Sequence, residues 1–182
     1  MIYFVTTNHG KYREVASLLH EHGITIEREQ LPVPEIQADT SEEVVRYSLD
    51  VLLGLTAHDV LVDDSGFYVD ALNGFPGVYS AYAFRTIGIR GVLRLLGGEE
   101  DRRARFETVM GVRLGGEVHV FQGVCRGTVA HGPRGQEGFG FDPIFTPDGE
   151  TRTFAEMSTA EKNAISHRGN ATRQVAAFLK GR

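Results

Sequence analysis

Short apolar runs alternate with amphipathic stretches along the first hundred residues. Continuous apolar runs predict buried strands at residues 2–5 and 60–62, and Ile24-Thr25-Ile26 is interpreted as a further strand. Apolar residues at helical spacing predict three helices: one ending near residue 22, one from a Thr40 cap to Gly54, and one over residues 85–96. This alternation of strand and helix is typical of the α/β class.

The second half of the chain follows a different pattern. Apolar and polar residues alternate with period two over residues 104–114 and again from residue 118, on either side of Gly115 and Gly116. This pattern predicts a long antiparallel hairpin, which residues 127–131 are predicted to continue as a third strand. Two further helices are predicted after Ser158 and Ser166. We therefore expect one α/β domain over residues 1–182, built on a mixed sheet.

Composition narrows the functional classes. The chain has 182 residues, of which 41% are hydrophobic and 24% charged, enough for one sizeable core. Its net charge of −5 disfavours nucleic acid or an anionic membrane as a partner, and no apolar run is long enough to span a bilayer. The single cysteine, Cys125, cannot form an internal disulfide and is expected to be a small buried side chain. These features predict a cytoplasmic protein.

Two adjacent carboxylates, Asp63 and Asp64, follow the apolar run of residues 60–62, where that strand is expected to end. Acids at the end of a buried strand are unfavourable unless a cation meets them. Glu35, in an extended segment between prolines and a helix, is either a surface acid or a further carboxylate aimed at that cation, and Asp142 is another candidate. Because no Cys or His ligand cluster accompanies these acids, they suit Mg²⁺ or Mn²⁺ rather than zinc.

Basic and hydrogen-bonding residues supply the complementary set. Lys162 and Arg168 fall near the N-termini of their predicted helices, where the helix dipole disfavours cations, so a role as anion ligands is favoured. The loop over residues 6–11 would present N–H groups to an anion, although a simple helix cap with a solvated Lys11 explains it equally well. The aromatic stretch 139–145 suits either the stacking of a flat ring or core packing. A metal with Lys and Arg around phosphates is typical of phosphoryl chemistry.

Four stretches together resemble the inosine triphosphate pyrophosphatase family, in the order in which that family carries them. They are Thr6-Thr7-Asn8-His9-Gly10-Lys11, Asp63-Asp64-Ser65-Gly66 with Gly74-Phe75-Pro76-Gly77-Val78-Tyr79-Ser80, Gly138-Phe139-Gly140-Phe141-Asp142-Pro143-Ile144-Phe145, and Thr153-Phe154-Ala155-Glu156-Met157-Ser158 through Glu161-Lys162-Asn163 to Ser166-His167-Arg168. Pro34-Glu35-Ile36 and Tyr82 are closer to the archaeal and eukaryotic branch. The resemblance implies an elongated mixed sheet flanked by helices, with two lobes and the active site in a cleft between them.

The resemblance also implies an activity, the hydrolysis of ITP, dITP or XTP between the α and β phosphates to a monophosphate and pyrophosphate. It implies Mg²⁺ as the cofactor and a homodimer, and we expect exposed apolar residues around 75–84 to contribute to the dimer interface. Two alternatives stay open: a related pyrophosphatase for pyrimidine or modified nucleotides, and a nucleotide-binding sensor that has lost hydrolysis.

Residue roles are implied by the same resemblance. Asp64 would be the general base and, with Glu35, a metal ligand, while Asp63 would support Asp64 indirectly and residues 74–80 would form a wall of the cleft. The residues implied to bind substrate are Thr7, Asn8, His9, Gly10, Lys11, Ser65, Phe139, Gly140, Phe141, Asp142, Lys162, His167 and Arg168. A pocket that donates hydrogen bonds to a 6-oxo group and offers no partner to a 2-amino group would select hypoxanthine and xanthine over adenine and guanine.

Overall fold

The fold is built on one seven-stranded mixed sheet, seen in a computed structural model that describes residues 1–182. The strands follow the order β2-β1-β3-β5-β6-β7, and β4 pairs with β3. The strands are β1 (Ile2–Val5), β2 (Ile26–Glu29), β3 (Asp59–Val69), β4 (Pro76–Gly77), β5 (Arg103–Leu114), β6 (Glu117–Val129) and β7 (Phe145–Pro147). The helices are α1 (His9–Glu21), α2 (Ser41–Leu53), α3 (Ser80–Thr86), α4 (Gly88–Leu95), α5 (Thr159–Ile165) and α6 (His167–Lys180).

The mixed α/β class predicted from the sequence is confirmed. β1 runs parallel to β2 and β3, whereas all other pairings are antiparallel. The β5–β6 hairpin is also as predicted, and it turns through Gly115 and Gly116. Both glycines have positive φ, +57° and +88°, which a two-residue hairpin turn of the right twist requires.

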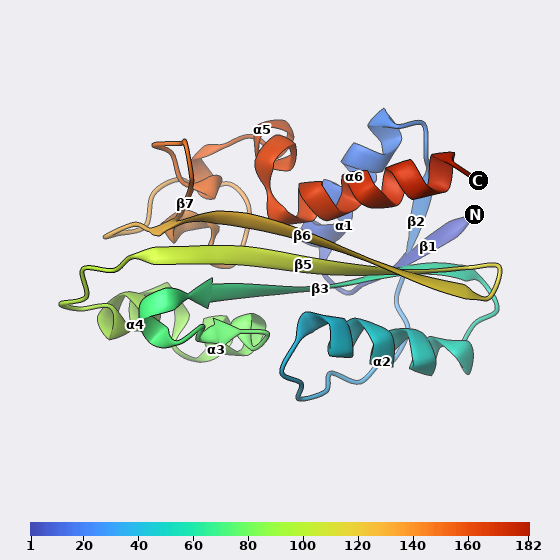
Figure 1. Cartoon of the computed structure of the whole chain (residues 1–182), viewed down its shortest axis with the longest axis horizontal. Helices are drawn as coiled ribbons and strands as arrows, with labels where there is room; N and C mark the ends of the chain where they lie inside the picture. Colours follow the sequence, from blue (N-terminus) through green and yellow to red (C-terminus); the bar gives the residue numbers. More distant parts are fainter.

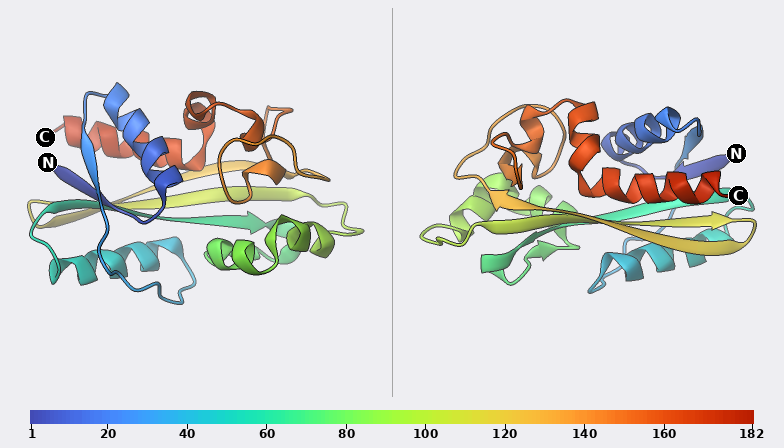
Figure 2. Two further views of the ribbon diagram at one scale, coloured as in Figure 1. Left: turned by 180° about the vertical axis from the view of Figure 1, so that it is seen from behind. Right: turned by 45° about the horizontal axis from the view of Figure 1, so that its top comes forward.

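Helices cover both faces of the sheet along an elongated molecule. α1, α5 and α6 lie on one face and α2, α3 and α4 on the other, and the two chain termini lie close together (Figures 1 and 2). One hydrophobic core fills the end that carries α4 and β7, and two more lie on opposite faces at the end that carries β1 and β2. The two-lobed shape follows from these separate cores. No helix is both long and apolar enough to cross a membrane.

The strand expected to end at the acidic pair in fact continues through it. β3 runs eleven residues, and its pairing with β5 is unbroken from Val60 to Val69. On its other edge, β1 pairs only as far as Leu61 and β4 begins opposite Phe67, so residues 62–66 have no strand neighbour there. The prediction of a strand end was wrong because the main chain of an acidic residue can stay in the ladder when side chains elsewhere neutralise the charge.

Three other boundaries differ from prediction. The helix expected over residues 85–96 is two helices, α3 and α4, because Gly88, the first residue of α4, adopts a φ of +62°. Residues 127–129 end β6 rather than starting a third strand, and the strand beyond them in the sheet is β7. The second strand lies at Ile26–Glu29, two residues later than expected. The helix starts at Thr40, Ser158 and Ser166 are as predicted, each with the cap's side chain accepting a backbone N–H.

Candidate functional site

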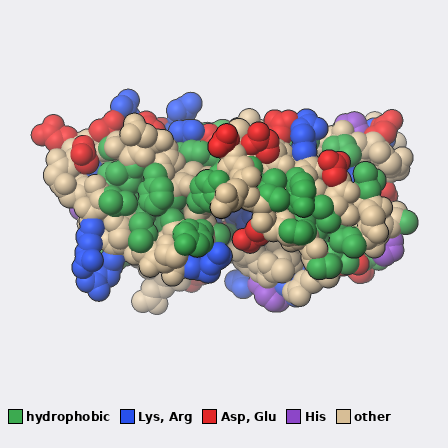
Figure 3. Space-filling view, turned by 90° about the horizontal axis from the view of Figure 1, so that it is seen from below, with side chains coloured by type: hydrophobic (Ala, Val, Ile, Leu, Met, Phe, Trp, Pro, Cys, Tyr) green, Lys and Arg blue, Asp and Glu red, His purple; other side chains and the backbone are tan.

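A cavity of about 530 Å³ opens beside the unpaired edge of β3. Its lining combines the loop before α1, the segment before α2, the middle of β3, the start of α3 and the loop after residue 138. In the view from below, a hollow lies between two groups of hydrophobic side chains, with charged side chains visible in it (Figure 3). The cavity therefore gathers segments from both lobes.

Nearly all of the predicted site residues line this cavity. They are Thr7, Asn8, Lys11, Glu35, Asp64, Ser65, Phe139, Gly140, Phe141, Asp142, Lys162, His167 and Arg168. His9 and Gly10 do not line it. Gly10 instead lies beneath the Phe139 ring, since a Cβ there would come within 2.5 Å of it.

The loop before α1 serves as a helix cap as well as cavity lining. The Asn8 side-chain oxygen accepts a hydrogen bond from the backbone N–H of Lys11 at 3.1 Å. The backbone N–H of Asn8 donates to the Thr6 hydroxyl. The Lys11 ammonium is not simply directed into solvent, because its Nζ forms an ion pair with Oδ1 of Asp63 at 3.1 Å. The capping interpretation is therefore correct for Asn8, and Lys11 is directed into the cavity.

Asp63 and Asp64 are neighbours on a strand, so their side chains point to opposite faces of the sheet. The side chain of Asp63 is 1% exposed and its carboxylate is satisfied: Nζ of Lys11, Nε of Arg168 at 3.4 Å and the hydroxyl of Ser65 all reach it. Asp64 is the opposite case, since its buried Oδ2 has no hydrogen-bond partner. Burial raises the pKa of Asp64, and the charge of Lys11 only partly opposes this.

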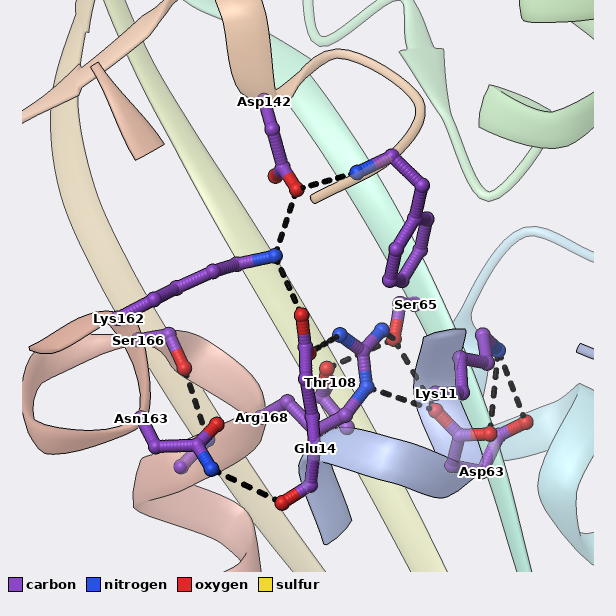
Figure 4. Close-up of polar contacts among 12 residues, drawn as sticks. Lys11, Glu14, Asp63, Ser65, Thr108, Asp142, Lys162, Asn163, Ser166 and Arg168 are labelled. Atoms are coloured by element: carbon purple, nitrogen blue, oxygen red, sulfur yellow. Dashed lines mark hydrogen bonds and ion pairs between the residues drawn. The ribbon is translucent and has the colours of Figure 1, made fainter. Parts of the chain in front are cut away.

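Glu14 on α1 is the centre of a buried ionic network that the sequence analysis missed. Its two carboxylate oxygens accept from Nζ of Lys162 at 2.7 Å and from Nη1 of Arg168 at 2.6 Å. Lys162 also donates to Asp142 at 2.6 Å (Figure 4). Burial alone would raise the pKa of Glu14, but the charges of Arg168 and Lys162 outweigh it and leave that pKa below its ordinary value.

This network changes the interpretation of Lys162 and Arg168. Both are buried, and each faces two carboxylates of the protein itself rather than standing free near a helix N-terminus. Asp142 is likewise committed, because it accepts from Lys162 and from the backbone N–H of Phe139 at 2.8 Å. Asp142 thus holds the Phe139 loop against the network.

Aromatic side chains form the end of the cavity next to this network. The Phe139 ring lies 4.9 Å from Nζ of Lys162 and 5.4 Å from the guanidinium carbon of Arg168. His167 stacks on Phe106 at 4.6 Å, and its Nδ1 has no hydrogen-bond partner. Burial, with the nearby charges of Arg168 and Lys162, holds the pKa of His167 well below its usual range, so the imidazole is neutral.

A divalent cation would fit the Asp64 side of the cavity. Glu35 lies in the cavity lining with Asp64, and no group of three or more His, Cys, Asp or Glu side chains is placed to hold a metal. Mg²⁺ needs no such cage, because it commonly binds one or two carboxylates and completes its shell with water and phosphate oxygens. The unpartnered Oδ2 of Asp64 is the observation that supports this fit.

Comparison with known proteins assigns the chain to a family. The model of the Ham1 family matches residues 2–178. The chain belongs to the Ham1 family. The family membership that the four sequence stretches indicated is therefore confirmed.

Similar proteins cover the Ham1 chain from end to end. A protein of Pyrococcus horikoshii named dITP/XTP pyrophosphatase is 47% identical, over 98% of this chain and 96% of its own. One of the same name from Thermococcus kodakarensis is 50% identical, over 97% and 96%. Among solved structures, the Ham1 protein of Staphylococcus aureus has a TM-score of 0.84 at 34% identity, covering 99% of this chain and 98% of its own, and a HAM1 protein from Coxiella burnetii has 0.86 at 33%, covering 100% and 98%.

Two features of this Ham1 site extend what the sequence indicated. Of the glycine-rich stretch expected to form a wall, Val78 and Ser80 line the cavity, and the wall continues along α3 through Phe84 and Arg85. The sequence does contain a sign that Glu14 is buried. It precedes Leu18 by four residues, so it lies on the apolar face of its helix.

Proposed function

We propose that this protein hydrolyses non-canonical purine nucleoside triphosphates, with dITP, ITP and XTP as substrates, to the nucleoside monophosphate and pyrophosphate. The names of relatives about half identical over the full length support this substrate class. The observation that carries the proposal is the cavity itself. It brings an unpartnered buried carboxylate, Asp64, together with a cationic network and the half-buried aromatic ring of Phe139.

Asp64 is proposed as the general base. Water attacks the α-phosphorus, the Asp64 carboxylate accepts the proton of that water, and the bond from the α-phosphorus to the α–β bridging oxygen breaks, so that pyrophosphate leaves. A base with a raised pKa is better suited to this proton transfer than an exposed aspartate. Lys11 and the loop residues Thr7 and Asn8 would hold the phosphates in place.

Mg²⁺, or Mn²⁺ in its place, is proposed as the cofactor, held by Glu35 and Asp64. When bound it would neutralise charge on the phosphate oxygens and polarise the phosphoryl group. Asp63 would then have an indirect role, because its carboxylate is already satisfied by Lys11 and Arg168 and serves to position them.

Base selection has a physical basis in the cationic network. Lys162 and Arg168 can only donate hydrogen bonds, and both lie against the ring of Phe139, on which a purine would stack. Their charges are balanced by carboxylates of the protein, but each keeps N–H groups that these contacts do not use. A 6-oxo group accepts from such donors, whereas the 6-amino group of adenine is itself a donor. An unpartnered 2-amino group would penalise guanine by about 1–3 kcal/mol.

A nucleotide panel tests the proposal. Pyrophosphate release is measured for dITP, XTP, ITP, GTP, ATP, dCTP and dUTP, with and without Mg²⁺, and we expect high kcat/KM for the first three with Mg²⁺. Equal kcat/KM for ITP, XTP, GTP and ATP would refute the base-selection argument. A preference for the pyrimidine nucleotides would favour the related pyrophosphatase, and tight binding without release would favour a sensor.

We also propose that the protein acts as a homodimer in the cytoplasm. Phe75, Tyr79, Tyr82 and Phe84 are each at least 40% exposed and lie close together in sequence. A patch of this kind supports an interface with a second copy. Sedimentation equilibrium of the wild-type protein and of Y82D measures the mass directly; a monomeric wild-type protein would refute the dimer.

A further inference from the structure

Three of the four cations that line the cavity already face carboxylates of the protein. Lys11 faces Asp63, and the other two are held within the Glu14 network at 2.6–3.4 Å. These three cations are balanced by Glu14, Asp63 and Asp142. With Glu35 and Asp64 committed to a divalent cation, the charges of these residues cancel.

Arg85 is the fourth cation that lines the cavity, and it is exposed. Its guanidinium makes no side-chain hydrogen bond or ion pair with the rest of the protein. It lies in the last turn of α3, where the helix dipole favours a positive charge. α3 lies on the opposite face of the sheet from α1, which carries Lys11 (Figure 1). Arg85 therefore approaches the cavity from the other side.

The position of α3 is fixed by its first residue. The Ser80 hydroxyl accepts the backbone N–H of Phe67 on β3 at 2.7 Å and donates to the carbonyl of Gly77. Phe84 packs edge-on against Phe141 at 5.4 Å between ring centroids. Arg85 thus stands on a helix that is anchored to the sheet and to Phe141.

We infer that Arg85 binds the pyrophosphate portion of the substrate, an inference that rests on the proposed function. A triphosphate brings several negative charges into a cavity whose other charges cancel, so the one uncommitted cation is its counterpart. The planar guanidinium offers paired N–H donors that match phosphate oxygens in a bidentate contact. The purine is uncharged and the monophosphate carries less charge, so Arg85 distinguishes triphosphate from monophosphate.

Calorimetric titration with inorganic pyrophosphate at a fixed Mg²⁺ concentration tests the inference without turnover. R85Q is expected to weaken pyrophosphate binding about 10- to 100-fold, as for the loss of a hydrogen-bonded charge. R85K keeps the positive charge but lacks the paired N–H donors of the guanidinium, so its pyrophosphate affinity is expected to lie between those of R85Q and wild type. R90Q is the matched control, because Arg90 is exposed on the neighbouring helix α4, does not line the cavity, and should bind pyrophosphate as wild type does.

Titration with inosine monophosphate completes the test, and its affinity should be the same in R85Q and wild type. Equal pyrophosphate affinity in R85Q and wild type, an equal loss in R85Q and R90Q, or no pyrophosphate binding by the wild-type protein would each overturn the inference. If Arg85-dependent pyrophosphate binding is found but no nucleotide in the panel is hydrolysed, the proposed function fails and the assignment of Arg85 stands.

Discussion

Glu14 on α1 accepts a 2.6 Å hydrogen bond from Nη1 of Arg168 on α6, across 154 residues of sequence. Both side chains are buried, at 6% and 2% exposure, so the pair joins the two ends of the chain inside the protein. Through Lys162, the same carboxylate is tied to Asp142 and hence to the Phe139 loop. Glu14 therefore sets the positions of Lys162 and Arg168, the two cations proposed to bind the purine base.

Replacing this acid should destabilise the protein. E14Q leaves Lys162 and Arg168 short of a buried counter-charge, and removing one partner of a buried ion pair costs about 3–5 kcal/mol. Urea unfolding at pH 7 measures the loss in the free energy of unfolding. E42Q is the control, because Glu42 pairs with Arg46 on the exposed surface, where we expect at most about 0.5 kcal/mol.

The stability contributed by Glu14 should depend on pH. The folded-state pKa of Glu14 is lowered below its ordinary value of 4.5, so this stability is present above about pH 4.5 and is lost as the pH falls through the folded-state pKa. The difference between wild type and E14Q should therefore shrink on acidification below pH 4.5. A difference that is constant from pH 7 to pH 4 would contradict the assignment of a lowered pKa.

Removing the proposed base should abolish turnover and spare the fold. D64N should lower kcat by at least about 100-fold, since general bases contribute about 10²- to 10⁴-fold. Its melting temperature should not fall, because the neutral amide relieves the cost of burying a charge at this position. D50N, at an exposed position of α2, is the matched control with normal activity; near-normal turnover by D64N would refute the role of Asp64.

Gly10 should be intolerant of a side chain for a local reason. A Cβ at this position would meet the Phe139 ring at 2.5 Å, so G10A should displace the ring, raise KM for the nucleotide, and lower stability by about 1–3 kcal/mol. G54A is the comparison, because the nearest atom to a Cβ there is 3.6 Å away, an ordinary contact. Equal effects of the two substitutions on KM would show that Phe139 does not contact the substrate.

Cys125 should be unreactive in the folded protein. Burial raises the pKa of its thiol to about 12, and the residue is 8% exposed, so the nucleophilic thiolate is almost absent at pH 8. Labelling with a disulfide reagent at pH 8 should be slow for the native protein and complete in guanidinium chloride, with C125S as the blank. Rapid labelling of native protein would contradict the predicted burial.

The elements with strong local signals were predictable from the sequence. The β5–β6 hairpin has a period-two pattern and a glycine pair at its turn, and α2 and α5 have reciprocal caps, so local sequence determines them. The helix break at Gly88 was not predicted, because a glycine within an apolar helical pattern is compatible with continuation. Whether it adopts a positive φ depends on packing that the sequence does not display.

The residues of the site were predictable from the sequence, but the ion pairs and hydrogen bonds among them were much less so. Sequence patterns and the family resemblance identified residues that the cavity collects, yet the ion pairs among them depend on which helix faces come together. Adjacent charges such as Asp63 and Asp64 usually terminate a strand, so the sequence predicts a strand end where the structure has none. The Lys11 and Arg168 side chains that neutralise Asp63 come from α1 and α6, at opposite ends of the chain.

The edge of β3 that lacks a strand neighbour over residues 62–66 also makes the sheet narrow at this level. Here only β3, β5 and β6 run side by side, whereas β1 and β2 widen the sheet at one end and β4 and β7 at the other. The cavity therefore lies at the level where the fewest strands connect the two lobes.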